Sequence, residues 1–346
     1  MKVDYIIVGL GLAGLAFVEE LIENDKSFIV FEDDSQTSSL VAGGVYNPVI
    51  LKRFTPVWKG HQQLERALLF YKRLEDKFKQ KFDTSFFTRK VFKSIEDENN
   101  WFAALDKPLL SPYMRSKIIR DHVDGVLADF GFGELNGTGR IDTHKLVSTY
   151  REYLTKEGKI KFEKFEHHQI KFIENTINYN NIVANKIVFC EGFGIQQNPF
   201  FNHLPLKEAK GELITIHAPG LNIDFLLKST VFVLPLGDNL YKVGATFNWK
   251  DKTSIPSEEG KEELIEKLKK VITVPYKIVN QTAGIRPTVK DRRPMIGIHS
   301  EYNQLAVLNG LGTRGVMIAP TVAKSLYRHL EKGELLDKEI DIKRFS

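Results

Sequence analysis

The first thirty-odd residues constrain the fold more than any other stretch of this 346-residue chain. Val3 to Val8 is a run of β-branched and aromatic residues that predicts a buried strand, and Gly9-Leu10-Gly11-Leu12-Ala13-Gly14 follows it directly. Apolar residues near helical spacing predict a helix over Leu12 to Asn24, and Ser27 to Phe31 predicts a second strand that ends at Glu32. A glycine fingerprint between a strand and a helix, with an acid after the next strand, indicates an adenine dinucleotide site.

The residues of this fingerprint have separate physical roles. Gly9 would permit the tight turn, Gly11 would leave room for a pyrophosphate, and Gly14 would let helix and strand approach closely. The helix N-terminus would present N–H groups to the phosphates, and Glu32 would accept hydrogen bonds from ribose hydroxyls. The alternative is a glycine-rich turn in an ordinary α/β unit, and the stretch by itself suits NAD as well as FAD.

Composition and charge exclude several classes of protein. Hydrophobic residues make up 42% of the chain and charged residues 27%, as in a globular protein, and the length suits two domains. The single cysteine, Cys190, excludes an internal disulfide and a multi-cysteine metal site, and no histidine spacing suits a metal, so we expect none. We read the histidines, including His167-His168, as structural or surface residues. A net charge of +5 suits an anionic cofactor or substrate but is too weak to indicate nucleic acid.

No apolar run reaches membrane-spanning length, and the N-terminus runs straight into the first strand without a signal peptide. We therefore expect a cytoplasmic protein without a membrane partner.

The order of patterns along the chain predicts an α/β fold interrupted by α+β segments. The small-residue loop Ala42 to Asn47 could lie against a cofactor or be a simple Gly-Gly turn. Strands separated by turn signals, with a lone helix over Ser257 to Val271, replace the α/β pattern from Leu206 to Val279. The α/β patterns predict helices or strands over Trp58–Phe82, Asp142–Glu157, Lys161–Phe165, Lys186–Cys190, Leu305–Leu308 and Val316–Lys332.

Several patches in this order resemble one family of flavoenzymes over nearly the whole chain. The most specific is G-x-R-P-x-x-x-D-x-x-P-x-I-G from Gly284 to Gly297, followed by G-x-G-x-x-G-x-x-x-A-P from Gly310 to Pro320. With Lys210-Gly211-Glu212 and the N-terminal fingerprint, these patches resemble the D-amino-acid oxidase and glycine/sarcosine oxidase family of FAD enzymes. Gly44 to Pro48 and Gly312 to Gly315 look closer to the oxidase half of the bifunctional tRNA wobble-uridine modifying enzyme. This length of chain would lack that enzyme's methyltransferase half.

The resemblance implies a Rossmann-like FAD-binding domain with an inserted substrate domain built on a large antiparallel sheet. Residues 1–82, 139–205 and 283–346 would form the FAD-binding domain, and residues 83–138 and 206–282 the substrate domain. Because no cysteine matches the position used for covalent attachment, we expect non-covalent FAD. The implied cofactor-binding residues are Gly9, Gly11, Gly14, Glu32, Gly43, Gly44, Val45, Asn47, Gly192, Gly310, Gly312, Thr313, Gly315 and Val316.

Three residues are candidates for contact with the substrate. In the family, the arginine of the G-x-R-P motif, here Arg286, clamps the substrate carboxylate; the alternative is an arginine in a domain-junction salt bridge. Arg314 is a candidate for a second anion contact, and Tyr46 is the third candidate. Phe232 stands where several glycine and sarcosine oxidases carry a tyrosine, which puts glycine in doubt as substrate and suits a more apolar pocket.

These features predict oxidation of the C–N bond of a carboxylate-bearing amine, with hydride transfer to flavin and reoxidation by dioxygen. A rival hypothesis is oxidation of a carboxymethylaminomethyl-uridine in tRNA, which requires a phosphate-binding surface. The patterns also leave open a flavin-binding regulator without turnover and an NAD-dependent dehydrogenase. Candidate residues for a phosphate-binding surface are Lys77, Lys79, Lys81, Arg89, Lys90, Lys93, Arg115, Lys117 and Arg120.

Overall fold

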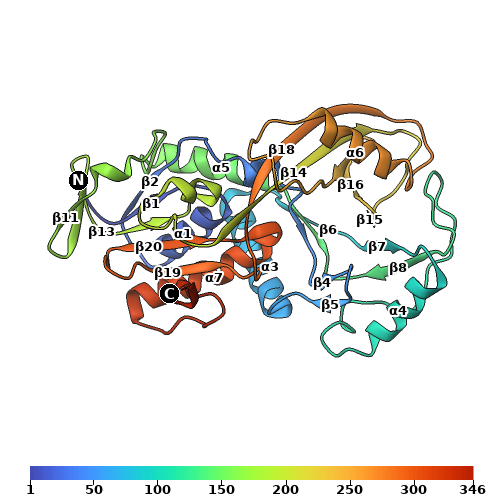
Figure 1. The fold of residues 1–346 in the computed structure, drawn as a ribbon, viewed down its shortest axis with the longest axis horizontal. Coiled ribbons are helices and arrows are strands. Elements are labelled where there is room, and N and C mark those ends of the chain that lie inside the picture. Colours follow the sequence, from blue (N-terminus) through green and yellow to red (C-terminus); the bar gives the residue numbers. More distant parts are fainter. Residues whose placement is uncertain (346) are drawn as a thin grey trace.

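The computed structural model describes residues 1–345, which form two lobes, each built on one large sheet (Figure 1). The first sheet begins with the order β10-β2-β1-β13. One end of β13 pairs with β20, which pairs with β19, and the other end pairs with β12, which pairs with β11. Its strands are β1 (Lys2–Val8), β2 (Phe28–Phe31), β10 (Ile160–Lys161), β11 (Lys171–Ile173), β12 (Thr176–Tyr179), β13 (Ile182–Phe189), β19 (Met295–Ile298) and β20 (Leu305–Asn309).

The core of this sheet is parallel and buried on both faces. β1 pairs in parallel with β2 and β13, and β13 pairs in parallel with β20. Tyr5 and Ile7 pack toward the helices, whereas Ile6 and Val8 face a second apolar cluster on the opposite side. Because both faces are covered, the strands are nearly continuous apolar runs, as the sequence shows. The helices beside the sheet are α1 (Leu12–Glu23), α3 (Gly60–Phe78), α5 (Thr143–Lys156) and α7 (Gly315–Lys332).

The second sheet has seven strands in the order β18-β14-β17-β16-β15-β7-β8. All neighbouring pairs are antiparallel except β15 and β7, which are parallel. The helix α6 (Glu258–Leu268) places Leu264 and Leu268 in the apolar cluster on one face, with Val233 and Val243 of the sheet. The strands are β7 (Thr88–Val91), β8 (Phe132–Leu135), β14 (Leu206–His217), β15 (Leu226–Lys228), β16 (Phe232–Gly237), β17 (Leu240–Gly244) and β18 (Lys277–Val289).

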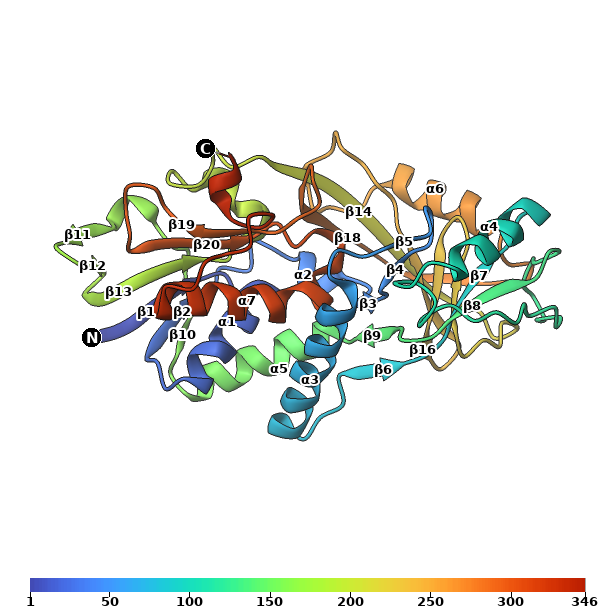
Figure 2. The ribbon, with the colours of Figure 1, turned by 90° about the horizontal axis from the view of Figure 1, so that it is seen from below.

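The long strands β14 and β18 pair along their whole length and run from one lobe into the other (Figure 2). The sequence pattern predicts no strand over β18, because Gly284 and Pro287 disfavour a regular strand. The remaining elements are α2 (Ser38–Val41), α4 (Ile95–Leu105), β3 (Val45–Tyr46), β4 (Val49–Ile50), β5 (Thr55–Pro56), β6 (Asp83–Ser85) and β9 (Gly139–Ile141), with short 3-10 helices at His167–Gln169, Gly192–Gln197, Gly312–Arg314 and Ile342–Phe345.

Several predicted boundaries are corrected by the structure. The helix expected over Trp58 to Phe82 is shorter and corresponds to α3. Of the strand expected over Lys161 to Phe165, only Lys161 is in a strand, at the end of β10. Lys77, a candidate for the phosphate-binding surface, pairs through its ammonium with Glu19, and this ammonium lies 4.5 Å from the Tyr153 ring centroid. Helical spacing alone cannot show such contacts, because the partners come from α1 and α5.

The two sheets follow the predicted segments with one exception. All strands of the first sheet fall within 1–82, 139–205 and 283–346, whereas β18 crosses the boundary at 283. The exact division into domains stays a prediction. No helix in the described residues is long and apolar enough to cross a membrane.

Candidate active site

A cavity of about 780 Å³ lies between the two lobes and contains most of the predicted site residues. Its walls are formed by the turns after β1, β2, β13 and β20 and by one face of the second sheet. Backbone without side chains forms much of this wall, which suits a long ligand in close contact with peptide groups. The glycines that line it are Gly9, Gly11, Gly43, Gly44, Gly192, Gly194, Gly211, Gly284, Gly312 and Gly315.

The fingerprint turn builds one end of the cavity. Gly14 does not line it; a Cβ there would lie 2.0 Å from the carbonyl oxygen of Gly9, so glycine is required for the close approach of helix and strand. The N–H of Leu12 in the first turn of α1 donates to Ser39 Oγ at 3.1 Å. Ser39 also lines the cavity, and sequence reasoning misses it because a serine in a polar loop carries no distinctive signal.

Glu32 lies buried at the end of β2 and faces the same cavity. Its Oε2 accepts a hydrogen bond from the Leu10 N–H (2.5 Å), and its Oε1 accepts one from the Asp34 N–H (3.0 Å). Arg151 of α5 lies 3.2 Å from the same carboxylate. Burial raises the pKa of Glu32, while the Leu10 N–H and Arg151 favour its charged form. Sequence reasoning misses Arg151 because it lies more than a hundred residues away along the chain.

Beyond Glu32 the wall is aromatic and includes Phe165 and His167. The ring nitrogen Nε2 of His167 lies 2.8 Å from Glu191 Oε1. His168 is exposed, as expected for a surface residue. The interpretation of His167 as merely structural is therefore incomplete, because this side chain also faces the cavity.

The other end of the cavity brings together segments that are far apart in sequence. The predicted residues Gly43, Gly44 and Val45 line it, and a Cβ at Gly43 would lie 3.3 Å from Phe232 of β16. The chain between β20 and α7 contributes the predicted residues Gly312 and Thr313, the first turn of α7 contributes Gly315 and Val316, and Gly192 follows β13.

Arg286 of β18 extends into this end. Its Nη1 donates to the carbonyl oxygen of Thr246 at 3.2 Å, and its guanidinium carbon lies 4.2 Å from the Phe247 ring centroid. A Cβ at Gly211 would lie 1.9 Å from Arg286 Nη2, so the guanidinium occupies the space that this glycine leaves. Burial lowers the pKa of Arg286 to about 10. No carboxylate in residues 1–345 contacts it, so the structure does not support the alternative of a domain-junction salt bridge.

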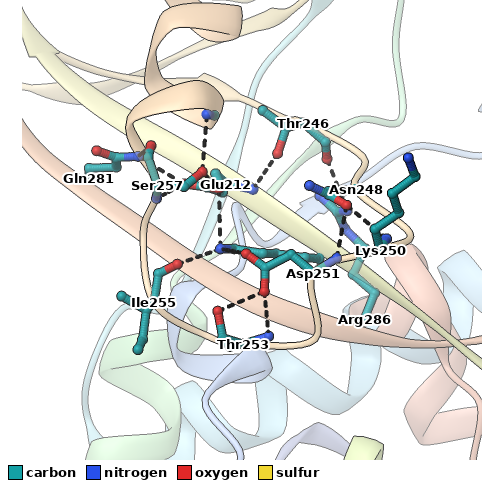
Figure 3. A network of polar contacts seen from close by, with 12 residues as sticks. Glu212, Thr246, Asn248, Lys250, Asp251, Thr253, Ile255, Ser257, Gln281 and Arg286 are labelled. Atoms are coloured by element: carbon teal, nitrogen blue, oxygen red, sulfur yellow. Dashed lines mark hydrogen bonds and ion pairs between the residues drawn. The ribbon is translucent and has the colours of Figure 1, made fainter.

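A buried ionic network holds the loop that carries Phe247 (Figure 3). The ammonium of Lys210, only 1% exposed, lies 2.6 Å from Asp251 Oδ2 and 3.4 Å from Glu212 Oε1. Glu212 also accepts hydrogen bonds from Ser257 and Gln281, and its backbone N–H donates to Thr246 Oγ1. The network therefore connects β14 to both sides of the loop that contacts Arg286.

Some predicted residues do not reach the cavity. The Tyr46 hydroxyl donates to Asp83 Oδ1 at 2.9 Å, and Asn47 Oδ1 accepts a hydrogen bond from the Val49 N–H at 2.8 Å. A Cβ at Gly310 would meet Val289 at 2.7 Å, so Gly310 is a packing position. Arg314 is half-buried at the start of α7 and is not among the lining residues. Cys190, by contrast, does line the cavity; it is buried, and burial raises the pKa of its thiol, which disfavours a role as a nucleophile.

The chain belongs to the FAD dependent oxidoreductase (DAO) family, whose pattern it matches over residues 4–328. It is 26% identical over 212 residues to glycine oxidase of Bacillus subtilis, covering 55% of this chain and 56% of that enzyme. It is 27% identical over 157 residues to the tRNA 5-methylaminomethyl-2-thiouridine biosynthesis bifunctional protein MnmC of Idiomarina loihiensis, covering 42% of this chain and 25% of that protein. The matches thus span about half of the length of the glycine oxidase and a quarter of the length of the MnmC protein.

The fold agrees with solved structures of this kind. The glycine oxidase of Geobacillus kaustophilus superposes with a TM-score of 0.79 over 97% of both chains, at 18% sequence identity. The predicted fold class and the recognition of the family are confirmed, and the chain is an FAD enzyme of this family.

The residues present fit FAD. The cavity is long enough to join the fingerprint turn to Arg286, and its glycine walls leave peptide groups accessible. Gly9, Gly11 and the start of α1 would hold the pyrophosphate, and Glu32 would hold the ribose. The flavin would lie near Gly43 to Val45 and near Gly312 to Val316, where the N-terminus of α7 favours negative charge.

Replacing Glu32 with glutamine is expected to weaken FAD binding about tenfold. The substitution removes the charged acceptor for ribose hydroxyls and leaves Arg151 without its buried partner. FAD dissociation constants from quenching of flavin fluorescence measure the effect. The control is Asp33→Asn, because Asp33 lines the same cavity but is exposed. The affinity of this variant for FAD should stay close to that of the unmodified protein. Equal affinity of the two variants would contradict the role of Glu32.

Proposed function

We propose that this chain oxidises the C–N bond of an amine that carries a carboxylate, and that Arg286 binds this carboxylate. The observation that carries the proposal is a half-buried guanidinium that lines the cavity without a protein carboxylate in residues 1–345. A planar guanidinium suits two carboxylate oxygens, and the Phe247 ring and the Thr246 carbonyl fix its orientation. Arg286 would therefore receive the substrate in one orientation without prior rearrangement.

The chain's own residues bind and orient the substrate. When bound, FAD supplies a two-electron acceptor for the hydride from the carbon beside the substrate nitrogen. The resulting imine is hydrolysed by water to an amine or ammonia and a carbonyl compound, and dioxygen is the proposed final electron acceptor. The side chains of Arg286 and Phe232 line the same cavity and would position that carbon, so correct placement accounts for much of the rate.

No side-chain base is needed if the amine binds in its neutral form. The acids that line the cavity are Glu32, Asp33, Glu163 and Glu191, and all follow strands of the first sheet. The wall built by the second sheet contains none of them. The absence of an acid beside Arg286, among the residues described, also avoids competition with the substrate carboxylate.

The likeness to glycine oxidase supports an amino acid as the substrate, but Phe232 favours one larger than glycine. A phenyl ring cannot supply a hydroxyl hydrogen bond, and it lies between the Gly43 loop and β17 as an apolar surface. We therefore propose an N-substituted amino acid or a D-amino acid with an apolar portion.

A second candidate is oxidation of a modified uridine in tRNA, which the likeness to MnmC proteins favours. The nine cations predicted to form a phosphate-binding surface give it little support. Six of them pair with acids, so little of their charge is free for phosphates; they are Lys77, Lys81, Arg89, Lys90, Arg115 and Arg120. Lys79, Lys93 and Lys117 have no such pair in the described part of the chain.

Anaerobic reduction of the bound flavin by a panel of amines tests both candidates. The panel contains D-amino acids, glycine, N-alkylglycines and tRNA with carboxymethylaminomethyl-uridine. We expect N-alkylglycines or D-amino acids to bleach the flavin absorbance faster than glycine. Bleaching by the tRNA alone, with binding that weakens steeply as salt rises, would favour the second candidate. A protein that is photoreduced normally but bleached by none of them would be a regulator, and the proposal would be wrong.

A further inference from the structure

The acidic side chains and most of the basic side chains that line the cavity lie at opposite ends of it. The acids all lie at the end built by the first sheet, and Lys164 lies beside Glu163 at that end. The other end contains cations only, within the residues described. Those cations are Lys52, Lys228, Lys267 and Arg286. Lys267 pairs with Glu263, so one carboxylate on Arg286 would leave Lys52 and Lys228 without an anionic partner.

Lys228 is the most unusual of these cations. It ends β15 and is half-buried, and burial, with repulsion from Lys267 and Lys93, lowers the pKa of its ammonium to about 8. No acid or carbonyl of residues 1–345 pairs with it, whereas Lys267 pairs with Glu263 and Lys52 is exposed. A partly buried ammonium without an anionic partner is costly, and an anion from outside the chain would offset that cost.

Lys228 and Arg286 lie on the same face of the second sheet. Lys228 is opposite Phe232, Phe232 is opposite Gly244, and Gly244 is opposite Leu213. Residues directly opposite one another share a face, and Gly211, against which the Arg286 guanidinium packs, is two residues from Leu213 and so on that face too.

Three strand spacings, about 14 Å, separate β15 from β14. The two cations therefore lie on either side of Phe232, too far apart to bind one small carboxylate together. A ligand that reached both would have to be elongated.

We propose that Lys228 binds a second anionic group of the substrate, on the substituent remote from the carboxylate that Arg286 binds. The inference rests on the proposed function and narrows its substrate class. The substrate would be an N-substituted amino acid with an apolar spacer over Phe232 and a carboxylate or phosphate at the far end. Glycine and simple N-methyl amino acids would leave the Lys228 subsite empty.

Binding of unreactive anions to the FAD-loaded protein tests the subsite without any turnover. Flavin difference spectra give dissociation constants for dicarboxylates from succinate to sebacate, for monocarboxylates of equal length, and for ω-phosphonocarboxylates. We expect the longer dicarboxylates to bind about tenfold more tightly than matched monocarboxylates. Tighter binding of the phosphono series would identify the second group as a phosphate, and tighter binding of the dicarboxylates as a carboxylate.

Lys228→Met should abolish this preference and leave monocarboxylate binding unchanged. The matched control is Lys242→Met, because Lys242 is half-buried on the same face of β17 but does not line the cavity. Equal binding of monocarboxylates and dicarboxylates, or a preference that survives Lys228→Met, would overturn the inference. Oxidation of N-alkylglycines would then still support the proposed function, whereas failure of every amine to reduce the flavin would overturn that function instead.

Discussion

Replacing Arg286 with methionine is expected to lower kcat/KM for every carboxylated amine by about a hundredfold or more, with FAD still bound. Loss of a buried charge from a hydrogen-bonded ion pair costs about 2–5 kcal/mol, and each 1.4 kcal/mol is about tenfold. Methionine keeps an unbranched apolar stem, so the packing against Phe247 is partly retained. Steady-state kinetics with the best amine of the panel, together with the flavin spectrum of the purified variant, measure the two effects.

Two further variants test whether the effect depends on the charge of Arg286 itself and on the position of its guanidinium. Arg314→Met removes a half-buried arginine that does not line the cavity, and a much smaller loss is expected. Gly211→Ala keeps Arg286 but places a methyl group where its guanidinium lies, so most of the hundredfold loss should reappear. Gly220→Ala controls for the added methyl, which there would meet only Val274 at 3.3 Å. Unchanged kinetics of the Arg286→Met variant would show that Arg286 does not bind the substrate.

Replacing Lys210 with methionine should lower the free energy of unfolding by about 3–5 kcal/mol, because it leaves Glu212 buried without its cationic partner. Guanidinium unfolding of the FAD-saturated protein, followed by circular dichroism, measures the change. Lys252→Met is the control: its pair with Glu208 is partly exposed, and pairs of that kind contribute at most about 1 kcal/mol.

The Lys210 variant should also bind substrate less well. Asp251 and Ile255 would lose the ammonium that ties their loop to β14, and the same loop positions Thr246 and Phe247 against Arg286. We expect a higher KM with FAD affinity unchanged. Equal stability of the Lys210 and Lys252 variants would show that the network contributes little to the fold.

The parts of the site that the sequence predicts are those carried by contiguous motifs. Gly9 to Glu32 is a single strand, turn, helix and strand, so its function can be inferred from local pattern. Arg286 is identified by the G-x-R-P motif, although the pattern around it does not predict β18. The structure leaves Tyr46 outside the cavity, because its hydroxyl is bound to Asp83.

A different set of residues depends on contacts between distant segments. Arg151 reaches Glu32 only because α5 lies beside β2, and Lys210 is buried only because the loop around Asp251 covers it. Lys228 becomes a candidate through strand register, which places it on the face that contains Phe232. No local pattern distinguishes these side chains from the many surface arginines and lysines of the chain.

The strand order of the first sheet also determines when the FAD site can be completed during translation. β1 is synthesised well before its sheet neighbour β13, which is about 180 residues later, and β20 with the start of α7 follows beyond residue 300. The fingerprint turn and the loop from Gly43 to Val45 are thus made long before Gly312 to Val316, which complete the flavin end of the cavity. A nascent chain would carry the pyrophosphate turn without a complete flavin pocket until residues 305–316 had been made, so we expect FAD to stabilise the fold only after that segment has been added.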